Sequence, residues 1–305
     1  MAVPMNSSDF RSVVEPILSE VFDGIYDQRD DEWQQVFNER TGTPRNFHEE
    51  PVLYGMGAAP EIPDGSAVTY QSGGVLFIQR YVYKVYGLAY ALTRVLVEDG
   101  DHIRLGKIMS EHLAQSMAET KETLCANVIN RATNASYPGG DGVALVSTSH
   151  PLASGTTSNR LTTDAALSQT SLEQMLIQIR NSVDNNGKRT KLIPKKIVCG
   201  PSLVFQAETL LKTALRVGTA NNDINPVKSM GLLGGGQANI ARMTSSTAWY
   251  IQTSAQTNGL KLMMRRKLDK GMEGDFDTDS MRYKATERYA VGFTDWRSLY
   301  GTPGL

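Results

Sequence analysis

Apolar residues recur every three or four positions near the start of the chain, which is the pattern of an amphipathic helix. The stripe consists of Phe10, Val13, Val14, Ile17, Leu18, Val21, Phe22 and Ile25. Pro16 cannot donate an interior hydrogen bond, so we expect a kink there or a helix that begins near Glu15. No complementary stripe follows closely in sequence, so these side chains must pack on distant residues or on another chain.

Residues 46–90 change the pattern from helical spacing to strand-like alternation. Three prolines and the Asp64–Gly65 pair interrupt the first part, which predicts a long excursion with a turn. Residues 75–90 are then rich in the β-branched and aromatic side chains that favour strands. A strand of that length would reach roughly 50 Å and would leave a pairing edge open on a single copy. We therefore expect this segment to lie on a neighbouring copy.

A long helix and a mixed second half complete the pattern. Acidic residues at 98–101 begin a helical stripe that continues to about Asn134. A loop rich in Gly, Ser and Thr follows, and then Thr170 and Glu173 form a capping box for a second helix. Further strands are predicted at 196–199, 248–251, 260–265 and within 283–300, and a helix from Pro201 to about Leu211. The chain is thus α+β, with two lobes linked through the long helix.

Charge is distributed unevenly along the chain, although the net charge is only -1. Residues 1–83 contain five arginines, no lysine and thirteen acidic residues, a net charge of -8, so the remainder carries +7. This asymmetry indicates two surfaces with different neighbours, and the lack of a global basic excess argues against wrapping nucleic acid. Two cysteines cannot form a disulfide scaffold, and we expect no secretory signal and no membrane-spanning segment.

The residue types that most often carry chemistry do not form a known motif. Gly234–Gly236 lacks the following Lys and Ser/Thr of a phosphate loop, and the four histidines and two cysteines match no zinc spacing. Residues 275–279 alternate aspartates like the start of a calcium loop, but Ser280 and Thr286 stand where glycine and glutamate are needed. We therefore predict no catalytic, cofactor-binding or metal-binding residues.

His150 lies near Ser147, Ser149 and Asp141, which are the residue types of a nucleophilic triad. A triad is defined by its geometry, and groups so close together on one loop seldom achieve it. A small hydrolase is therefore the weaker alternative for this chain.

The order of these features resembles the major capsid (head) protein of tailed bacteriophages, whose fold is shared with encapsulins and the herpesvirus capsid floor. The local matches are residues 21–37, Asn130-Arg131-Ala132 with Tyr137 and Gly139–Gly142, VSTSHPLASGTTSNRL at 146–161, Ala248–Tyr250 and TDWRSLYGTPG at 294–304. The resemblance covers essentially the entire chain. It implies an α+β tailed-phage major capsid fold with an N-terminal arm, an extended β-hairpin loop, a long spine helix, a peripheral domain and an axial domain.

The resemblance also divides the chain into parts. These are an N-terminal arm at 1–45, an extended loop at 46–90, a peripheral domain at 91–189 with the spine helix at about 101–134, an axial domain at 190–265, and C-terminal strands at 266–305 that return to the peripheral domain. The inter-subunit contacts we expect are Phe10, Val14, Phe22, Tyr54, Phe77, Arg80, Tyr81, Tyr83 and Lys84.

The implied function is structural, with no active site and no cofactor. Copies would assemble as hexamers and pentamers into the icosahedral head that encloses a double-stranded DNA genome. The implied partners are further copies, a separate scaffolding protein, the portal and head-completion proteins, and DNA held without sequence-specific contacts, with no membrane. The protein would be found in the virion capsid after assembly in the host bacterial cytoplasm. Some family members link their extended loops covalently through a lysine, but none precedes Lys84 here, so we expect no such link from this loop.

Two other shell or tube proteins stay open as alternatives. An encapsulin-like nanocompartment would share the fold and package protein cargo. A tail or fibre protein would form tubes instead of closed spheres.

Overall fold

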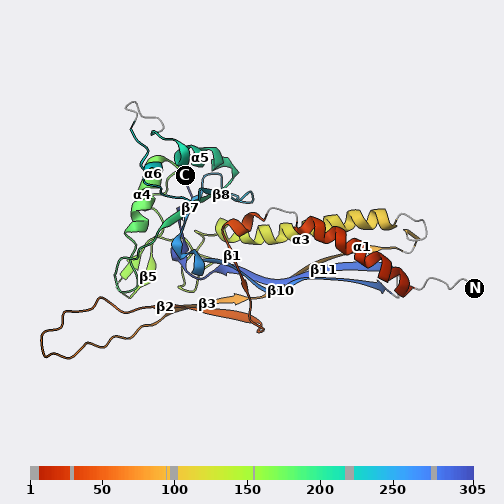
Figure 1. Cartoon of the computed structure of the whole chain (residues 1–305), viewed down its shortest axis with the longest axis horizontal. Coiled ribbons are helices and arrows are strands. Elements are labelled where there is room, and N and C mark those ends of the chain that lie inside the picture. Colours follow the sequence, from red (N-terminus) through yellow and green to blue (C-terminus); the bar gives the residue numbers. More distant parts are fainter. Residues whose placement is uncertain are drawn as a thin grey trace, which may run out of the picture.

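The structure is a computed structural model that describes residues 7–27, 31–93, 95–96, 102–153, 155–216, 223–275 and 280–305. Figure 1 shows three parts: an upper lobe, a long sheet that carries two helices on one face, and a hairpin that projects beyond the body below the lobe. The α+β class expected from the sequence is confirmed, because helices and strands both contribute to the same cores.

The long sheet has four strands within the described residues, in the order β1, β10, β11, β4. They span Asn38–Thr41, Leu260–Asp275, Ser280–Phe293 and Lys84–Leu92, respectively. β1 runs parallel to β10, and the other neighbours are antiparallel. β10 is much longer than the strand predicted at 260–265, because the charged residues after Met264 still pair with β11 across two register shifts. Of the calcium-like aspartates, Asp275 ends β10, and Asp277 and Asp279 lie outside the described residues.

Two helices cover one face of the long sheet (Figure 1). The spine helix α3 spans His102–Asn130, close to the predicted 101–134. Its 29 residues reach about 43 Å at about 1.5 Å each. Helix α1 spans Ser7–Asp27 and contains Pro16 in its interior. The expectation that α1 begins near Glu15 is therefore wrong, and the lost hydrogen bond is offset by packing of the face that contains Val14 and Leu18.

The apolar stripe of α1 packs against distant residues of its own chain. Val14, Leu18 and Phe22 form a core with three residues of α3 and three of the long sheet. The partners are Leu113, Ala114, Met117, Met272, Tyr283 and Ala285. α1 is therefore part of the folded subunit, and the expectation that the arm buries its apolar stripe between subunits is wrong for these residues.

The upper lobe contains a second sheet in the order β12, β9, β7, β8. These strands span Leu299–Thr302, Trp249–Thr253, Pro194–Cys199 and Gln237–Asn239. Helices α4 (Gln169–Arg180), α5 (Val204–Lys212) and α6 (Pro226–Ser229) belong to the same lobe. Its core joins this sheet to the C-terminal half of the spine helix, so the two lobes share one large apolar cluster. The last strand, β12, pairs with β9, so the C-terminal segment contributes to both sheets.

The projecting hairpin consists of β2 (Phe47–Tyr54) and β3 (Gly74–Val82). The single strand predicted over 75–90 is instead two strands, since the chain leaves β3 after Val82 and enters β4 at Lys84. β4 pairs with β11 throughout its length, so the second half of the predicted ribbon lies in its own subunit. The part of 46–90 that projects is therefore the first part.

Short elements complete the chain. β5 (His150–Leu152) and β6 (Gly155–Thr157) form a small hairpin, and 3-10 helices lie at Glu32–Gln35 (η1), Pro201–Leu203 (η2), Ser254–Asn258 (η3) and Trp296–Ser298 (η4). The capping box of α4 is made by Ser168 and Ser171, two residues before the predicted pair. Ser171 replaces the expected glutamate because its hydroxyl accepts the Ser168 amide proton.

Candidate functional site

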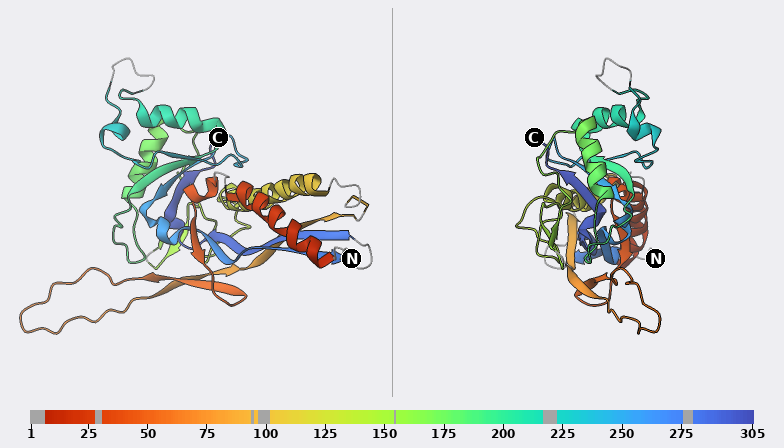
Figure 2. Two further views of the ribbon diagram at one scale, coloured as in Figure 1. Left: turned by 45° about the vertical axis from the view of Figure 1, so that its right-hand side comes forward. Right: turned by 90° about the vertical axis from the view of Figure 1, so that its left-hand side faces the viewer.

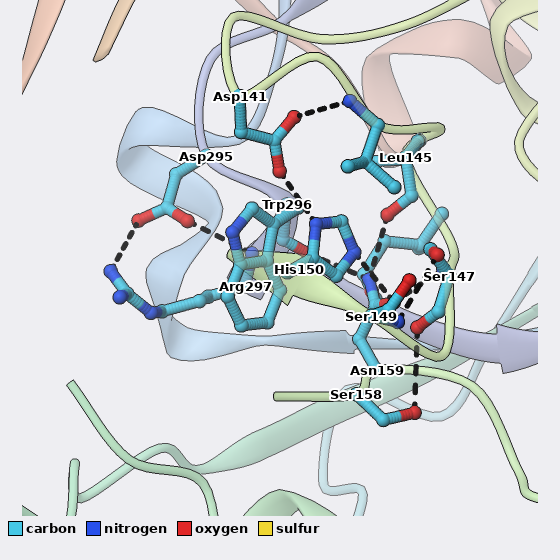
Figure 3. A network of polar contacts seen from close by, with 12 residues as sticks. Asp141, Leu145, Ser147, Ser149, His150, Ser158, Asn159, Asp295, Trp296 and Arg297 are labelled. Atoms are coloured by element: carbon cyan, nitrogen blue, oxygen red, sulfur yellow. Dashed lines mark hydrogen bonds and ion pairs between the residues drawn. The ribbon is translucent and has the colours of Figure 1, made fainter. Parts of the chain in front are cut away.

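A buried polar network surrounds His150 (Figure 3). The His150 side chain is fully buried and stacks on Trp296, with ring centroids 4.2 Å apart. Nδ1 lies 2.6 Å from Asp141 Oδ2, and Nε2 lies 3.0 Å from Asn159 Oδ1. Both ring nitrogens are therefore occupied by oxygen acceptors.

Asn159 fixes the other side of this network. Its Nδ2 group donates to the carbonyls of Leu145, Trp296 and Leu299, at 2.7, 3.3 and 2.8 Å. Its Oδ1 also accepts the Ser147 amide at 2.8 Å. The amide side chain thus ties the 146–161 loop to the C-terminal segment.

This geometry is structural and not catalytic. In a serine triad the second histidine nitrogen receives the proton of the nucleophile, but here that nitrogen faces Asn159. The Ser147 hydroxyl instead accepts the Ser149 amide at 3.3 Å. The hydrolase alternative therefore has no support in the arrangement of these residues.

A second buried polar cluster joins α1, α3 and the long sheet. Tyr26 Oη donates to Glu287 Oε1 at 2.6 Å, and Lys121 Nζ lies 3.2 Å from the same oxygen. Burial, followed by the Glu287 charge, raises the pKa of Tyr26, so its hydroxyl stays protonated and donates. Asp23 of α1 adds an ion pair with Lys270 of β10 at 2.6 Å. These contacts fix the arm helix to its own subunit.

Glu122 lies beside this cluster on α3. Its Oε1 accepts the Trp33 amide at a long 3.5 Å, and Arg242 Nη1 is 3.9 Å from Oε2. Burial raises the pKa of Glu122 to about 7 in spite of these two partners. Such a shift in a packed core needs no catalytic explanation.

Across the described ranges, no three metal-binding side chains come together. No described helix combines the length and the apolarity that crossing a bilayer would need.

The hairpin is the feature whose geometry points to a function. Figures 1 and 2 show its loop reaching beyond the rest of the chain in every view. β2 and β3 form a sheet of their own, and the loop at 55–73 is almost entirely exposed. The loop contacts the body near its start, where Asn186 Nδ2 donates to the Gly55 carbonyl at 2.6 Å, and the strands contact it through Glu50 and Tyr81.

The hairpin exposes apolar side chains that a monomer would be expected to bury. Leu53, Met56, Val68, Tyr70, Val75, Ile78 and Val82 are each more than half exposed, and Tyr70 is 96% exposed. Apolar side chains gathered on one projecting element mark a surface that is covered by a partner. We call the segment 47–82 the projecting hairpin and treat it as the candidate assembly surface.

The structure places four of the nine expected inter-subunit residues inside the subunit. Val14 and Phe22 are buried beneath α1, and Tyr81 and Tyr83 are buried with Met263. The Tyr81 and Thr294 hydroxyl oxygens lie 2.6 Å apart, and Tyr83 Oη accepts the Thr43 amide at 3.1 Å. Strand alternation predicts which side chains share a face, but it does not show that this face turns back onto the long sheet.

The other five expected contact residues are exposed, partly buried or have side chains outside the described residues. Arg80 and Lys84 are exposed, and Arg80 forms an ion pair with Glu49 at 2.6 Å on the hairpin surface. Tyr54 and Phe77 are partly buried. Phe10 lies in α1, and its side chain is outside the described residues. These residues stay predictions.

The exposed apolar positions that the sequence analysis did not single out include two on helices of the upper lobe. Phe205 of α5 is 84% exposed and Ile177 of α4 is 59% exposed. The signal was present, since Phe205 falls off the stripe formed by the buried Ala207 and Leu210.

The chain is similar in sequence to one family of known proteins. The sequence profile of a family described as phage capsid protein matches residues 79–301 of this chain. No curated protein sequence matches it.

Solved structures of similar fold are shells of viruses and virus-like particles. The mature capsid of bacteriophage PhiM1 superposes with a TM-score of 0.58 at 13% identity, covering 90% of this chain and 87% of that one. The capsid of cyanophage P-SCSP1u gives 0.57 at 12%, with 90% and 88% covered. A virus-like particle from Pyrococcus furiosus gives 0.52 at 7%, with 94% and 98% covered. At these identities the likeness is one of fold.

Proposed function

This chain belongs to the phage capsid protein family, and from that premise we propose how its copies build a shell. It is a major capsid protein of the tailed-phage type, a structural protein of the virion head and not an enzyme. The observation that carries the proposed assembly is the projecting hairpin with its exposed apolar side chains.

The hairpin of one copy lies across the adjacent copy in the shell. The contact is heterologous, because the hairpin is at one end of the molecule and the long sheet extends toward the other (Figure 1). Heterologous contacts generate rings when the rotation closes, here hexamers and pentamers. Burial of Leu53, Val75 and Ile78 at this contact supplies the apolar part of the interface.

The division of the chain follows the two sheets. Residues 190–259 form the axial domain at the ring centres, with β12 as its added strand, and the spine helix and the long sheet, which β10 enters at Leu260, form the peripheral domain. The arm at 1–45 is held on the peripheral domain by α1, and the extended loop is the hairpin at 47–82.

The remaining partners follow from a head that encloses a genome. A separate scaffolding protein sets the curvature, and portal and head-completion proteins occupy one vertex. Packaged double-stranded DNA touches the shell without base-specific contacts. Assembly takes place in the cytoplasm of the host bacterium.

The test is to shorten the hairpin without disturbing its strands. Tyr54 and Gly74 face one another in the register, so residues 55–73 can be replaced by Asn-Gly to close a two-residue turn. We expect a folded subunit with the unfolding midpoint of the intact chain, and no closed particles by negative-stain microscopy. A Gly/Ser loop of the original length is the matched control that separates the effect of length from that of sequence. Closed particles from the shortened variant would overturn the hairpin assignment.

A protein-filled nanocompartment is the second candidate. Such a shell would use the same fold, which this chain shares with the virus-like particle from Pyrococcus furiosus over 98% of that chain. The ratio of absorbance at 260 and 280 nm of purified particles from the natural source separates the two, since packaged DNA raises it. A protein-like ratio would support the nanocompartment.

A further inference from the structure

Phe205 is an exposed aromatic side chain on a regular helix. Its helix, α5, buries Ala207 and Leu210 against the upper lobe, and Phe205 lies on the opposite side with 84% of its surface exposed. Glu208 lies one turn further along the same outward face, where it pairs with Lys212. A large aromatic group in this position is typical of an anchor residue at an interface.

An apolar hollow lies between α4 and α6 of the same lobe. It has a volume of about 230 Å³ and is lined by Leu176, Ile177, Pro226, Val227, Met230 and Leu232, with Glu173 and Arg180 at its edge. Ile177 and Met230 are 59% and 57% exposed, so its walls are open to solvent. A cavity of about 150 Å³ with aliphatic walls is enough to bind benzene, so a phenyl ring fits this space.

The aromatic group and the hollow lie on different sides of the lobe. In Figure 1, α4 and α6 lie at the left of the upper lobe, and α5 lies toward its right. A contact between the α5 side of one copy and the α4–α6 side of the next is therefore head-to-tail. Such a contact repeats around a ring without using either surface twice.

Each surface carries one acidic and one basic side chain, Glu208 with Lys212 on α5 and Glu173 with Arg180 at the hollow, so the two surfaces can pair in the opposite order. Glu208 accompanies Phe205 on α5, and Arg180 is an exposed cation in the last turn of α4 at the edge of the hollow. Seating the phenyl ring would bring a carboxylate toward a guanidinium, which sets the orientation of the contact.

We propose that Phe205 of one copy inserts into the α4–α6 hollow of the next copy around a ring, with Glu208 directed to Arg180 of that copy. The inference rests on the proposed ring assembly. It adds the residue pair that joins neighbouring upper lobes, separately from the projecting hairpin.

Cysteine cross-linking in assembled particles tests the pair directly. The full chain carrying F205C and I177C is assembled, oxidised and run on a non-reducing gel, and we expect a ladder of covalent oligomers up to the ring size. Each single variant is a control. F205C with I193C is a matched wrong pair, because the exposed fraction of Ile193, 57%, is similar to the 59% of Ile177. The native Cys125 and Cys199 are buried and do not contribute.

The outcomes separate this inference from the proposed function. Closed particles without a ladder, or with an equal ladder from the wrong pair, would overturn the Phe205 contact and leave the capsid function standing. Absence of closed particles from the unmodified chain with its scaffold would overturn both.

A second variant covers the case in which the cysteines disturb assembly. F205A should unfold like the parent chain, because the side chain is exposed, but should raise the concentration needed for assembly at least about tenfold. F205L should restore most of the loss. Assembly of F205A at the parent concentration would contradict the proposal.

Discussion

His150 and Asp141 show how surroundings decide the role of a residue. Their types suggest acid-base chemistry, yet the imidazole is enclosed by Trp296, Asp141 and Asn159 and links the 146–161 loop to the C-terminal segment. The sequence indicated correctly that no catalytic triad forms. It could not show that Asn159 replaces the nucleophile, because that depends on how the loop folds back on β12.

Replacing His150 should destabilise the subunit strongly. H150A leaves the Asp141 carboxylate buried without its partner, which costs about 3–5 kcal/mol in the free energy of unfolding. Urea denaturation of the unassembled subunit measures the change. The control is H112A on the exposed face of α3, which should stay within about 0.5 kcal/mol of the parent. A similar small change for both variants would show that the contact between His150 and Asp141 is not needed for stability.

Glu122 should make subunit stability depend on pH. Burial raises its pKa from an ordinary 4.5 to about 7, so the folded chain holds this proton more tightly than the unfolded chain. Its contribution is complete below about pH 4.5 and is lost as pH rises to about 7. E122Q removes this slope and should be about 1–3 kcal/mol more stable than the parent at pH 8. Urea denaturation of the parent and E122Q from pH 4 to 8 measures this, with E111Q as the control. Parallel curves of stability against pH for the parent and E122Q would contradict the prediction.

At the scale of elements, periodicity predicted whether a segment is a helix or a strand better than it predicted the residues that the segment packs against. The spine helix, the strand at 194–199 and the helix after Pro201 appear almost where expected. The break at Tyr83 was not visible, because β-branched and aromatic residues continue on both sides of it. The full length of β10 was hidden by its charged residues, which lie on an exposed part of the sheet.

Helix α1 should be ordered before any shell forms. Leu18 is fully buried between α1 and α3, and Ser110 Oγ donates to the Leu18 carbonyl at 2.8 Å. We expect amides at 14–27 to resist hydrogen exchange in the unassembled subunit, and L18A to cost about 2–5 kcal/mol in the free energy of unfolding.

E20A on the exposed face of the same helix is the control. Rapid exchange along α1 in the free subunit, with protection only in particles, would mean that the arm folds on a neighbour.

For the whole molecule, the sequence predicted a shell protein because the order of its elements resembled a family. It also predicted that the strand-rich segment and the N-terminal arm would both find no place within their own chain. That prediction fits the hairpin and is wrong for α1 and β4, which pack in their own subunit. The interfaces themselves could not be read from the sequence, because exposure depends on the packing of both lobes.

Protease access should report the state of the hairpin. Residues 46–79 contain no lysine or arginine, so trypsin cannot cut there, but chymotrypsin can reach Tyr70, which is 96% exposed. We expect chymotrypsin to cleave after Tyr70 in free subunits and to spare it in particles, as shown by mass spectrometry. Trypsin is the control, since it should leave this segment whole in both states. Equal cleavage in both states would show that the loop stays uncovered.

A proline at the centre of β2 affects whether the hairpin can add strands from other copies edge to edge. β2 and β3 pair only with each other among the described residues, so each keeps a free edge of the kind that templates fibrils. Pro51, opposite Ile78, has no amide proton to offer an incoming strand. A proline at this position disfavours the addition of another strand along the β2 edge. At the β2 edge, docking onto a neighbour then depends more on side chains than on backbone pairing.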